Sequence, residues 1–128
     1  MEIRALVVDD NRDVRGVFTE LLQLAKISVV GTGINGREAA SLYERLHPDI
    51  VFMDAMMPEY DGFYGLDKIR EHDPGAVVVI VSGSFNVEER LDKCNASAIL
   101  PKPIDMGKVM AVVDRLCLGK RKEIPYLA

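Results

Sequence analysis

Ala5-Leu6-Val7-Val8, followed at once by Asp9-Asp10-Asn11, is the stretch that decides the fold. A short apolar run that stops at a polar corner is typical of a buried strand ending at one edge of a sheet. Beyond that corner, apolar residues recur at helical spacing, namely Val14, Val17, Phe18, Leu21, Leu22 and Ala25. The chain is therefore predicted to open with a strand, an acidic corner and an amphipathic helix.

The same alternation continues along the chain. Apolar or β-branched runs predict further strands over residues 27–30, 50–53, 77–81 and 97–100. Helical stripes predict helices over residues 39–46, 62–70, 87–94 and 106–116. The run over 77–81 is the most hydrophobic, so we expect it at the centre of the sheet. Strands that alternate with helices predict an α/β fold, a single parallel sheet with helices on both faces.

Composition excludes several functional classes. The 128 residues carry 16 Lys and Arg against 20 Asp and Glu, which gives a net charge of −4 and disfavours a nucleic-acid-binding surface. Apolar runs such as residues 76–81 are too short to cross a bilayer, and the first residues lack a signal-peptide pattern. Cys94 and Cys117 are expected as reduced thiols. We therefore expect a cytoplasmic protein with no direct contact to nucleic acid or membrane.

Polar side chains follow the predicted strands. Asp9 and Asp10 come after the first strand, Asp54 after the third, Ser82 after the fourth and Lys102 after the fifth. Because the carboxyl ends of parallel strands meet at one edge, these side chains are expected to lie together. Carboxylates at close quarters are unfavourable unless a cation compensates them, and an all-oxygen cluster suits Mg²⁺. The other role for an acid at such a corner is a helix N-cap, which Asp10 or Asn11 is expected to supply for the first helix.

The order of these motifs carries a resemblance to a known family. They are Val7-Val8-Asp9-Asp10-Asn11, Val51-Phe52-Met53-Asp54, Met57-Pro58-Glu59-Tyr60-Asp61-Gly62, Val81-Ser82-Gly83 and Lys102-Pro103. From about Arg4 to Leu118 the chain resembles the receiver domain of bacterial-type response regulators, the chemotaxis-regulator-like module of two-component signalling. The resemblance implies a doubly wound, flavodoxin-like sheet of five parallel strands in the order 2-1-3-4-5. It also implies a receiver domain over residues 1–118, with 119–128 as a tail or linker stub.

The resemblance assigns a phosphoacceptor and its helpers. Asp54 would attack a phosphohistidine and become an acyl phosphate. Lys102 would pair with the Asp54 oxygens and then with the phosphoryl group, and Ser82 would donate its hydroxyl to a phosphoryl oxygen. A bulky side chain at Gly83 would crowd that group. These roles agree with phosphoryl transfer, which depends mostly on positioning and on neutralising charge.

The resemblance also implies a metal site and partners. Asp10 would bind Mg²⁺ directly and Asp9 through water, with Asp54 and the backbone carbonyl of Met56 as further ligands. The donor would be a sensor histidine kinase or phosphotransfer protein. The output would be a downstream protein or effector domain, contacted through the face made by the helix over 87–94, the last strand and the helix over 106–116.

Further expectations concern the whole chain. The protein would catalyse only its own phosphorylation and dephosphorylation, as a monomer or a phosphorylation-dependent dimer. No effector domain follows in the sequence, so we expect either a single-domain regulator or a module excised from a longer one. The Lys102-Pro103 peptide bond is expected to be cis.

Two residues depart from the family pattern. Ile99 stands where the family usually has Tyr or Phe, and that aromatic ring swings inward on phosphorylation. A β-branched side chain is stiff and short, so we expect Ile99 to contribute packing and no rotamer switch. Pro101 precedes Lys102, where a small or polar residue is more common, and it is expected to stiffen the loop.

Two other functions compete with this interpretation. Gly31, Gly33 and Gly36 fit the G-x-G-x-x-G pattern of a dinucleotide-binding domain, with Asp54 some 20 residues further on. A phosphatase of the haloacid dehalogenase type also uses Mg²⁺ and an Asp at a strand end. That family needs a second acid two residues later, where this chain has Asn11.

Overall fold

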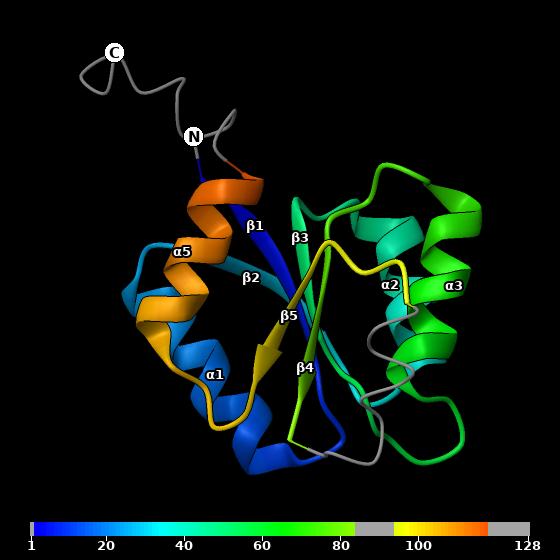
Figure 1. Cartoon of the computed structure of the whole chain (residues 1–128), viewed down its shortest axis with the longest axis horizontal. Coiled ribbons are helices and arrows are strands. Elements are labelled where there is room, and N and C mark those ends of the chain that lie inside the picture. The colour runs from blue at the N-terminus through cyan, green and yellow to red at the C-terminus, as the bar shows by residue number, and fades with distance from the viewer. Residues whose placement is uncertain (1, 84–93, 118–128) are drawn as a thin grey trace.

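Five parallel strands form one sheet in the order β2-β1-β3-β4-β5 (Figure 1). The computed structural model describes residues 2–83 and 94–117. The strands are β1 (Arg4–Val8), β2 (Ser28–Gly33), β3 (Ile50–Asp54), β4 (Val78–Ser82) and β5 (Ala98–Pro101). The described helices are α1 (Arg12–Leu24), α2 (Gly36–Leu46), α3 (Gly62–His72) and α5 (Met106–Leu116). The predicted α/β class and strand order are thus confirmed.

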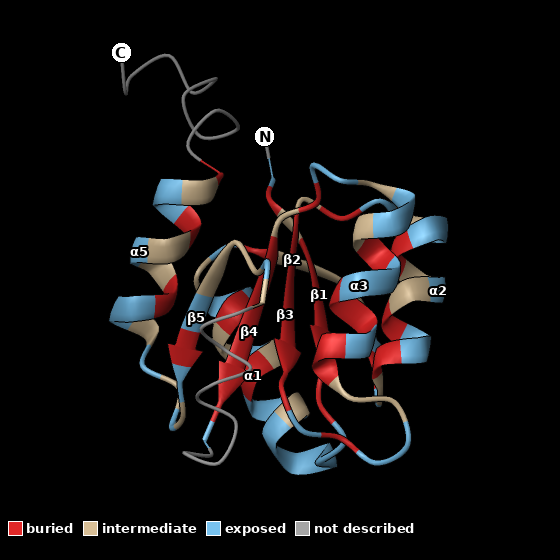
Figure 2. Cartoon of the chain, turned by 45° about the vertical axis from the view of Figure 1, so that its right-hand side comes forward, coloured by how far each residue is buried: buried red, intermediate tan, exposed pale blue. Residues whose placement is uncertain are grey.

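Helices cover both faces of the sheet, α1 and α5 on one side and α2 and α3 on the other (Figure 1). Successive residues of a strand point to opposite faces, so each interior strand feeds two hydrophobic cores. In β3, Val51 and Met53 pack toward α2 and α3, whereas Phe52 packs toward α1 and α5. β3 and β4 are buried along their whole length, whereas the edge strands β2 and β5 are partly exposed (Figure 2).

The sequence predicted that the strand over 77–81 lies at the centre of the sheet, but the structure places a different strand there. The predicted strand forms β4, which lies between β3 and β5, and β3 takes the central position. All five residues of β3 and of β4 are buried. The apolar run of β4 is therefore explained by helices that cover both faces of the sheet, and a central position is not required.

All four strands after β1 end later than predicted, by three residues in β2 and by one in each of the others. β2 continues through the glycines expected to end it, because its pairing with β1 reaches Val8 opposite Gly33 after a register shift between Ala5 and Leu6. β5 includes Pro101, which a sheet tolerates on an edge strand.

Local signals set the helix starts. Asn11, rather than Asp10, caps α1, and its side-chain oxygen accepts from the amides of Asp13 and Val14 at 3.0 Å each. Within the described ranges, no helix is long and apolar enough to cross a membrane. The predicted helix over 87–94 and the tail over 119–128 fall outside the described residues, apart from position 94.

Candidate phosphoacceptor and metal site

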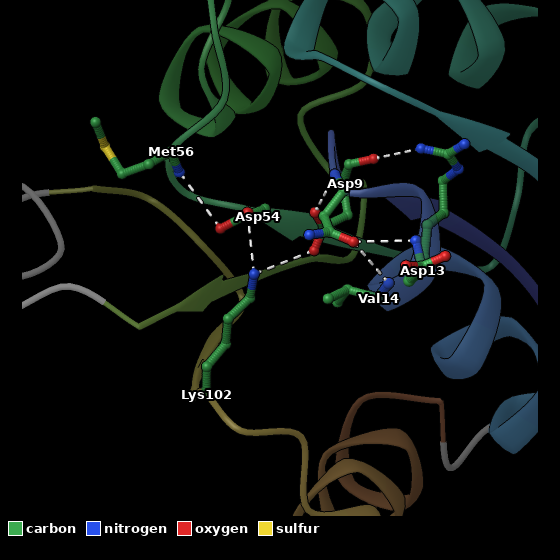
Figure 3. Close-up of polar contacts among 8 residues, drawn as sticks. Asp9, Asp13, Val14, Asp54, Met56 and Lys102 are labelled. Atoms are coloured by element: carbon green, nitrogen blue, oxygen red, sulfur yellow. Dashed lines mark hydrogen bonds and ion pairs between the residues drawn. The ribbon is translucent and has the colours of Figure 1, made fainter.

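The carboxyl ends of three strands bring the site together (Figure 3). Asp9 follows β1, Asp54 ends β3 and Lys102 follows β5. β1 pairs directly with β3, with Val8 opposite Met53, so the next residues Asp9 and Asp54 are neighbours across the sheet edge. The sequence prediction that these strand-end residues meet is therefore confirmed by the geometry.

The Lys102 ammonium bridges the two buried carboxylates. Its Nζ lies 3.1 Å from Asp9 Oδ2 and 3.1 Å from Asp54 Oδ2 (Figure 3). Burial lowers the pKa of Lys102, but the hydrogen bonds and charges of Asp54 and Asp9 outweigh burial and raise its pKa. The Lys102 amide donates to the Ser82 carbonyl at 2.9 Å, and the Lys102-Pro103 peptide bond is cis, as the resemblance implied.

Asp54 carries a charge that its surroundings only partly compensate. Burial raises the pKa of Asp54, the hydrogen bond and charge of Lys102 lower it, and the charge of Asp9 raises it again. The net shift is upward. The ionised carboxylate is therefore less favourable here than in water, which is the condition under which a further cation would stabilise it.

The acidic residues fit a magnesium ion. Asp9, Asp10 and Asp54 each offer a carboxylate oxygen, and these oxygens all lie within 4.8 Å of one another. Asp9 and Asp54 are buried, while Asp10 is exposed and open to water. Hard carboxylate oxygens beside solvent match the preference of Mg²⁺ for oxygen ligands with some waters retained.

Asp9 is held by the N-cap residue of α1 and by one residue within that helix. The Asn11 amide donates to Asp9 Oδ1 at 2.9 Å, and Arg15 Nη1 donates to the Asp9 carbonyl at 2.8 Å. Sequence reasoning missed Arg15. The signal was its spacing, because Arg15 lies four residues after Asn11 and therefore on the same side of α1.

The remaining predicted residues surround Asp54. The Met56 amide lies 3.4 Å from Asp54 Oδ1, and Ser82 is buried at the end of the neighbouring strand β4. A Cβ at Gly83 would lie 3.3 Å from Lys102 Cβ. In this structure Gly83 thus leaves room for the Lys102 side chain, a contact that sequence reasoning did not include.

The sequence model of the family described as the response regulator receiver domain matches residues 5–114. The chain belongs to this family. Receiver domains serve two-component systems and typically bind Mg²⁺ at an acidic pocket, which Asp9, Asp10 and Asp54 form here.

Individual proteins resemble this receiver domain to different extents. The chemotaxis protein CheY of Thermotoga maritima is 32% identical over 115 residues, which are 88% of this chain and 96% of that protein. A chain in the crystal structure of the CheX-CheY-BeF3-Mg+2 complex from Borrelia burgdorferi is 30% identical to this chain, with a TM-score of 0.78. The match covers 88% of this chain and 87% of that one.

Longer proteins contain a similar domain. The regulatory protein AtoC of Escherichia coli is 32% identical over 128 residues, which are 97% of this chain but 28% of AtoC. A protein-glutamate methylesterase/protein-glutamine glutaminase 2 of Methanosarcina mazei is 41% identical over 90 residues, 70% of this chain and 24% of that protein. The chain thus spans about a quarter of these two relatives, and the likeness concerns one domain of each.

Proposed function

We propose that this receiver domain accepts a phosphoryl group on Asp54 from a phosphohistidine of a sensor histidine kinase or phosphotransfer protein. The observation that carries the proposal is the position of the Asp54 carboxylate. It lies 3.1 Å from the Lys102 ammonium and within 4.8 Å of carboxylate oxygens of Asp9 and Asp10, at an edge that also carries Ser82. No reactant beyond the donor and Mg²⁺ is needed.

In the proposed step a carboxylate oxygen of Asp54 attacks phosphorus. The P–N bond to the donor histidine breaks and its electron pair stays on that nitrogen, so the histidine leaves as neutral imidazole with its proton on the other ring nitrogen. Lys102 stands within reach of the Asp54 oxygens and offsets charge on the transferred group. When bound by Asp9, Asp10, Asp54 and the Met56 carbonyl, Mg²⁺ would supply further neutralising charge.

The conformational change on phosphorylation is proposed to pass from the site to the output face through Ser82 and the last strand. Ser82 would donate its hydroxyl to a phosphoryl oxygen and draw the following segment with it. Ile99, 43% exposed on β5, is assigned a packing role. The output face would comprise residues 87–94, β5 and α5, and most of its first element lies outside the described residues.

A groove beside the site supports a protein donor. It runs between α1 and the segment after β5, and its lining includes Val14, Val17, Ile104 and the site residue Lys102. Val17 is 56% exposed, and apolar surface next to a reactive group is typical of a protein contact. The CheY of the Borrelia complex is held with Mg²⁺ and BeF3, which supports the same chemistry for this chain.

Several broader expectations belong to this proposal. The receiver domain occupies residues 1–118 and works in the cytoplasm as a monomer or a phosphorylation-dependent dimer. It catalyses only its own phosphorylation and dephosphorylation. Its output is a downstream protein or an effector domain.

The test is Mg²⁺-dependent labelling with radioactive acetyl phosphate. The wild-type chain should be labelled, Asp54→Asn should not, and Asp10→Asn should need more Mg²⁺ because one anionic ligand is lost. Asp67→Asn, an exposed change on α3, is the matched control and should be labelled normally. Labelling of Asp54→Asn at the wild-type rate would refute the assignment. Steady turnover of a phosphoester would favour the phosphatase alternative. The absence of any labelling would favour an interaction module that works without phosphate.

The structure weakens both competing functions. The dinucleotide-binding alternative needs the start of α2 open for a pyrophosphate, but the Gly36 amide already donates to the Tyr60 carbonyl at 2.8 Å. The phosphatase alternative needs a second acid at position 11, where the Asn11 side chain instead caps α1.

A further inference from the structure

The first turns of α2 and α3 touch through glycines. A Cβ on Gly36 would lie 2.2 Å from the Asp61 carbonyl oxygen and 2.7 Å from the Gly65 nitrogen. A Cβ on Gly65 would lie 2.9 Å from Gly36 Cα and 2.8 Å from Met53 Sδ. Among described glycines none has a positive φ, so close approach rather than backbone conformation requires glycine at these positions.

This contact reaches the segment that follows the phosphoacceptor. Residues 55–61 connect Asp54 to α3, and the Gly36 amide donates to the Tyr60 carbonyl within that segment at 2.8 Å. At the other end the Gly62 amide donates to the Ala55 carbonyl at 2.9 Å. A Cβ on Gly62 would lie 2.2 Å from the Asp54 carbonyl oxygen, so the start of α3 rests directly on the phosphoacceptor backbone.

The segment needs such support because it contains an unfavourable conformation. Glu59 has a φ of 69°, in the left-handed region that residues other than glycine rarely adopt. Contacts from the surrounding structure hold such residues in place. Gly36 of α2 contacts the adjacent Tyr60 through its amide and lies directly against Asp61.

We propose that Gly36 is a positioning residue for the phosphoacceptor site. By closing against Asp61 and Gly65, it holds residues 55–61 so that the backbone of Ala55 and Met56 stays beside Asp54. The inference rests on the proposed function of Asp54 and extends it to α2, which contributes no side chain to the site. It also gives the last glycine of the G-x-G-x-x-G pattern a role without a dinucleotide.

The test compares Gly36→Ala with Gly16→Ala. Gly16 also lies in a helix, but a Cβ there would meet nothing within 4 Å, so it is a matched control. The first readout needs no metal: amide hydrogen exchange at Gly62 should quicken at least tenfold in Gly36→Ala and stay unchanged in Gly16→Ala. The second is the Mg²⁺ dissociation constant from an NMR titration, which should rise about tenfold in Gly36→Ala, as for changes behind a metal ligand.

Further variants separate positioning from lost stability. Val113→Ala removes buried side-chain volume from the opposite core and should leave both readouts near wild type. If Gly36→Ala folds poorly, Gly65→Ala takes its place, because the added Cβ would meet Gly36 and the flexible Met53 side chain. Gly65→Ala should then show the same faster exchange and the same weaker Mg²⁺ binding. Glu59→Gly should recover part of the Mg²⁺ affinity of Gly36→Ala, because it removes the unfavourable φ.

The inference would be overturned if folded Gly36→Ala had the same hydrogen exchange at Gly62 and the same Mg²⁺ affinity as the wild type. It would also be overturned if Val113→Ala changed both readouts as much as Gly36→Ala does. Failure of the proposed function has a different signature. In that case the wild-type chain takes no label on Asp54, while the metal-free exchange comparison still decides whether Gly36 holds the segment.

Discussion

Replacing Lys102 with methionine should destabilise the metal-free protein by leaving two buried carboxylates without their bridging cation. Methionine keeps most of the alkyl chain that packs beside Gly83, so the loss is mainly that of the charge. Lys102→Met would leave Asp9 and Asp54, whose side chains are 9% and 11% exposed, in repulsion at the sheet edge.

The magnitude follows from two charge-assisted hydrogen bonds of 3.1 Å each. A hydrogen bond to a charged group contributes about 1.5–3 kcal/mol. The Lys102 side chain is 28% exposed, so water replaces part of that contribution. We expect the free energy of unfolding to fall by about 2 kcal/mol near pH 7, more than a typical surface substitution costs.

The assay is urea unfolding followed by far-UV circular dichroism in EDTA, since the sequence contains no tryptophan. Lys108→Met, an exposed change on α5, is the control and should stay within about 0.5 kcal/mol of wild type. Adding Asp54→Asn to Lys102→Met should restore stability, because it removes one of the two repelling charges. The gain in the free energy of unfolding should be larger in the Lys102→Met protein than in the wild type. A Lys102→Met protein as stable as the control, or one that Asp54→Asn does not rescue, would refute the reasoning.

Three further predictions concern the rest of the fold. Asn11→Ala removes the α1 cap and should cost about 1 kcal/mol in urea unfolding. Phe52→Ala removes a buried ring whose centroid lies 5.1 Å from that of Phe18, and it should cost about 3–5 kcal/mol in the same assay. The Tyr43 hydroxyl, 2.7 Å from Asp73 Oδ2, lowers the pKa of Asp73 below its usual 3.8. The folded pKa is thus depressed, so the stability difference between wild type and Tyr43→Phe should be present above about pH 4 and shrink below it. Equal stability of the two proteins at pH 7 would count against this role.

Much of the fold was predictable because its signals are local. Alternating apolar runs and helical stripes mark the elements, and the acids after the first and third strands mark the edge where Asp9 and Asp54 meet. Strand order came from the resemblance, because hydrophobicity does not rank β3 against β4 when both are fully buried.

The missed features depend on contacts that the pattern of apolar and polar residues does not show. Gly36 meets Asp61 and Gly65 only once two helices have packed, so its pattern equally suited a nucleotide site. Arg15 supports the Asp9 backbone carbonyl, an acceptor that carries no side-chain signal. β2 extended through its glycines because a neighbouring strand supplied hydrogen-bond partners.

The two cores on opposite faces of the sheet have a consequence for protein engineering. Val113 and its neighbours between α1 and α5 share no cluster with Leu66 and its neighbours between α2 and α3. Substitutions at distant sites without shared partners combine additively to within about 0.5 kcal/mol. Thermostability can therefore be raised by redesigning the α1–α5 core alone, while the helix pair behind Asp54 keeps its native packing.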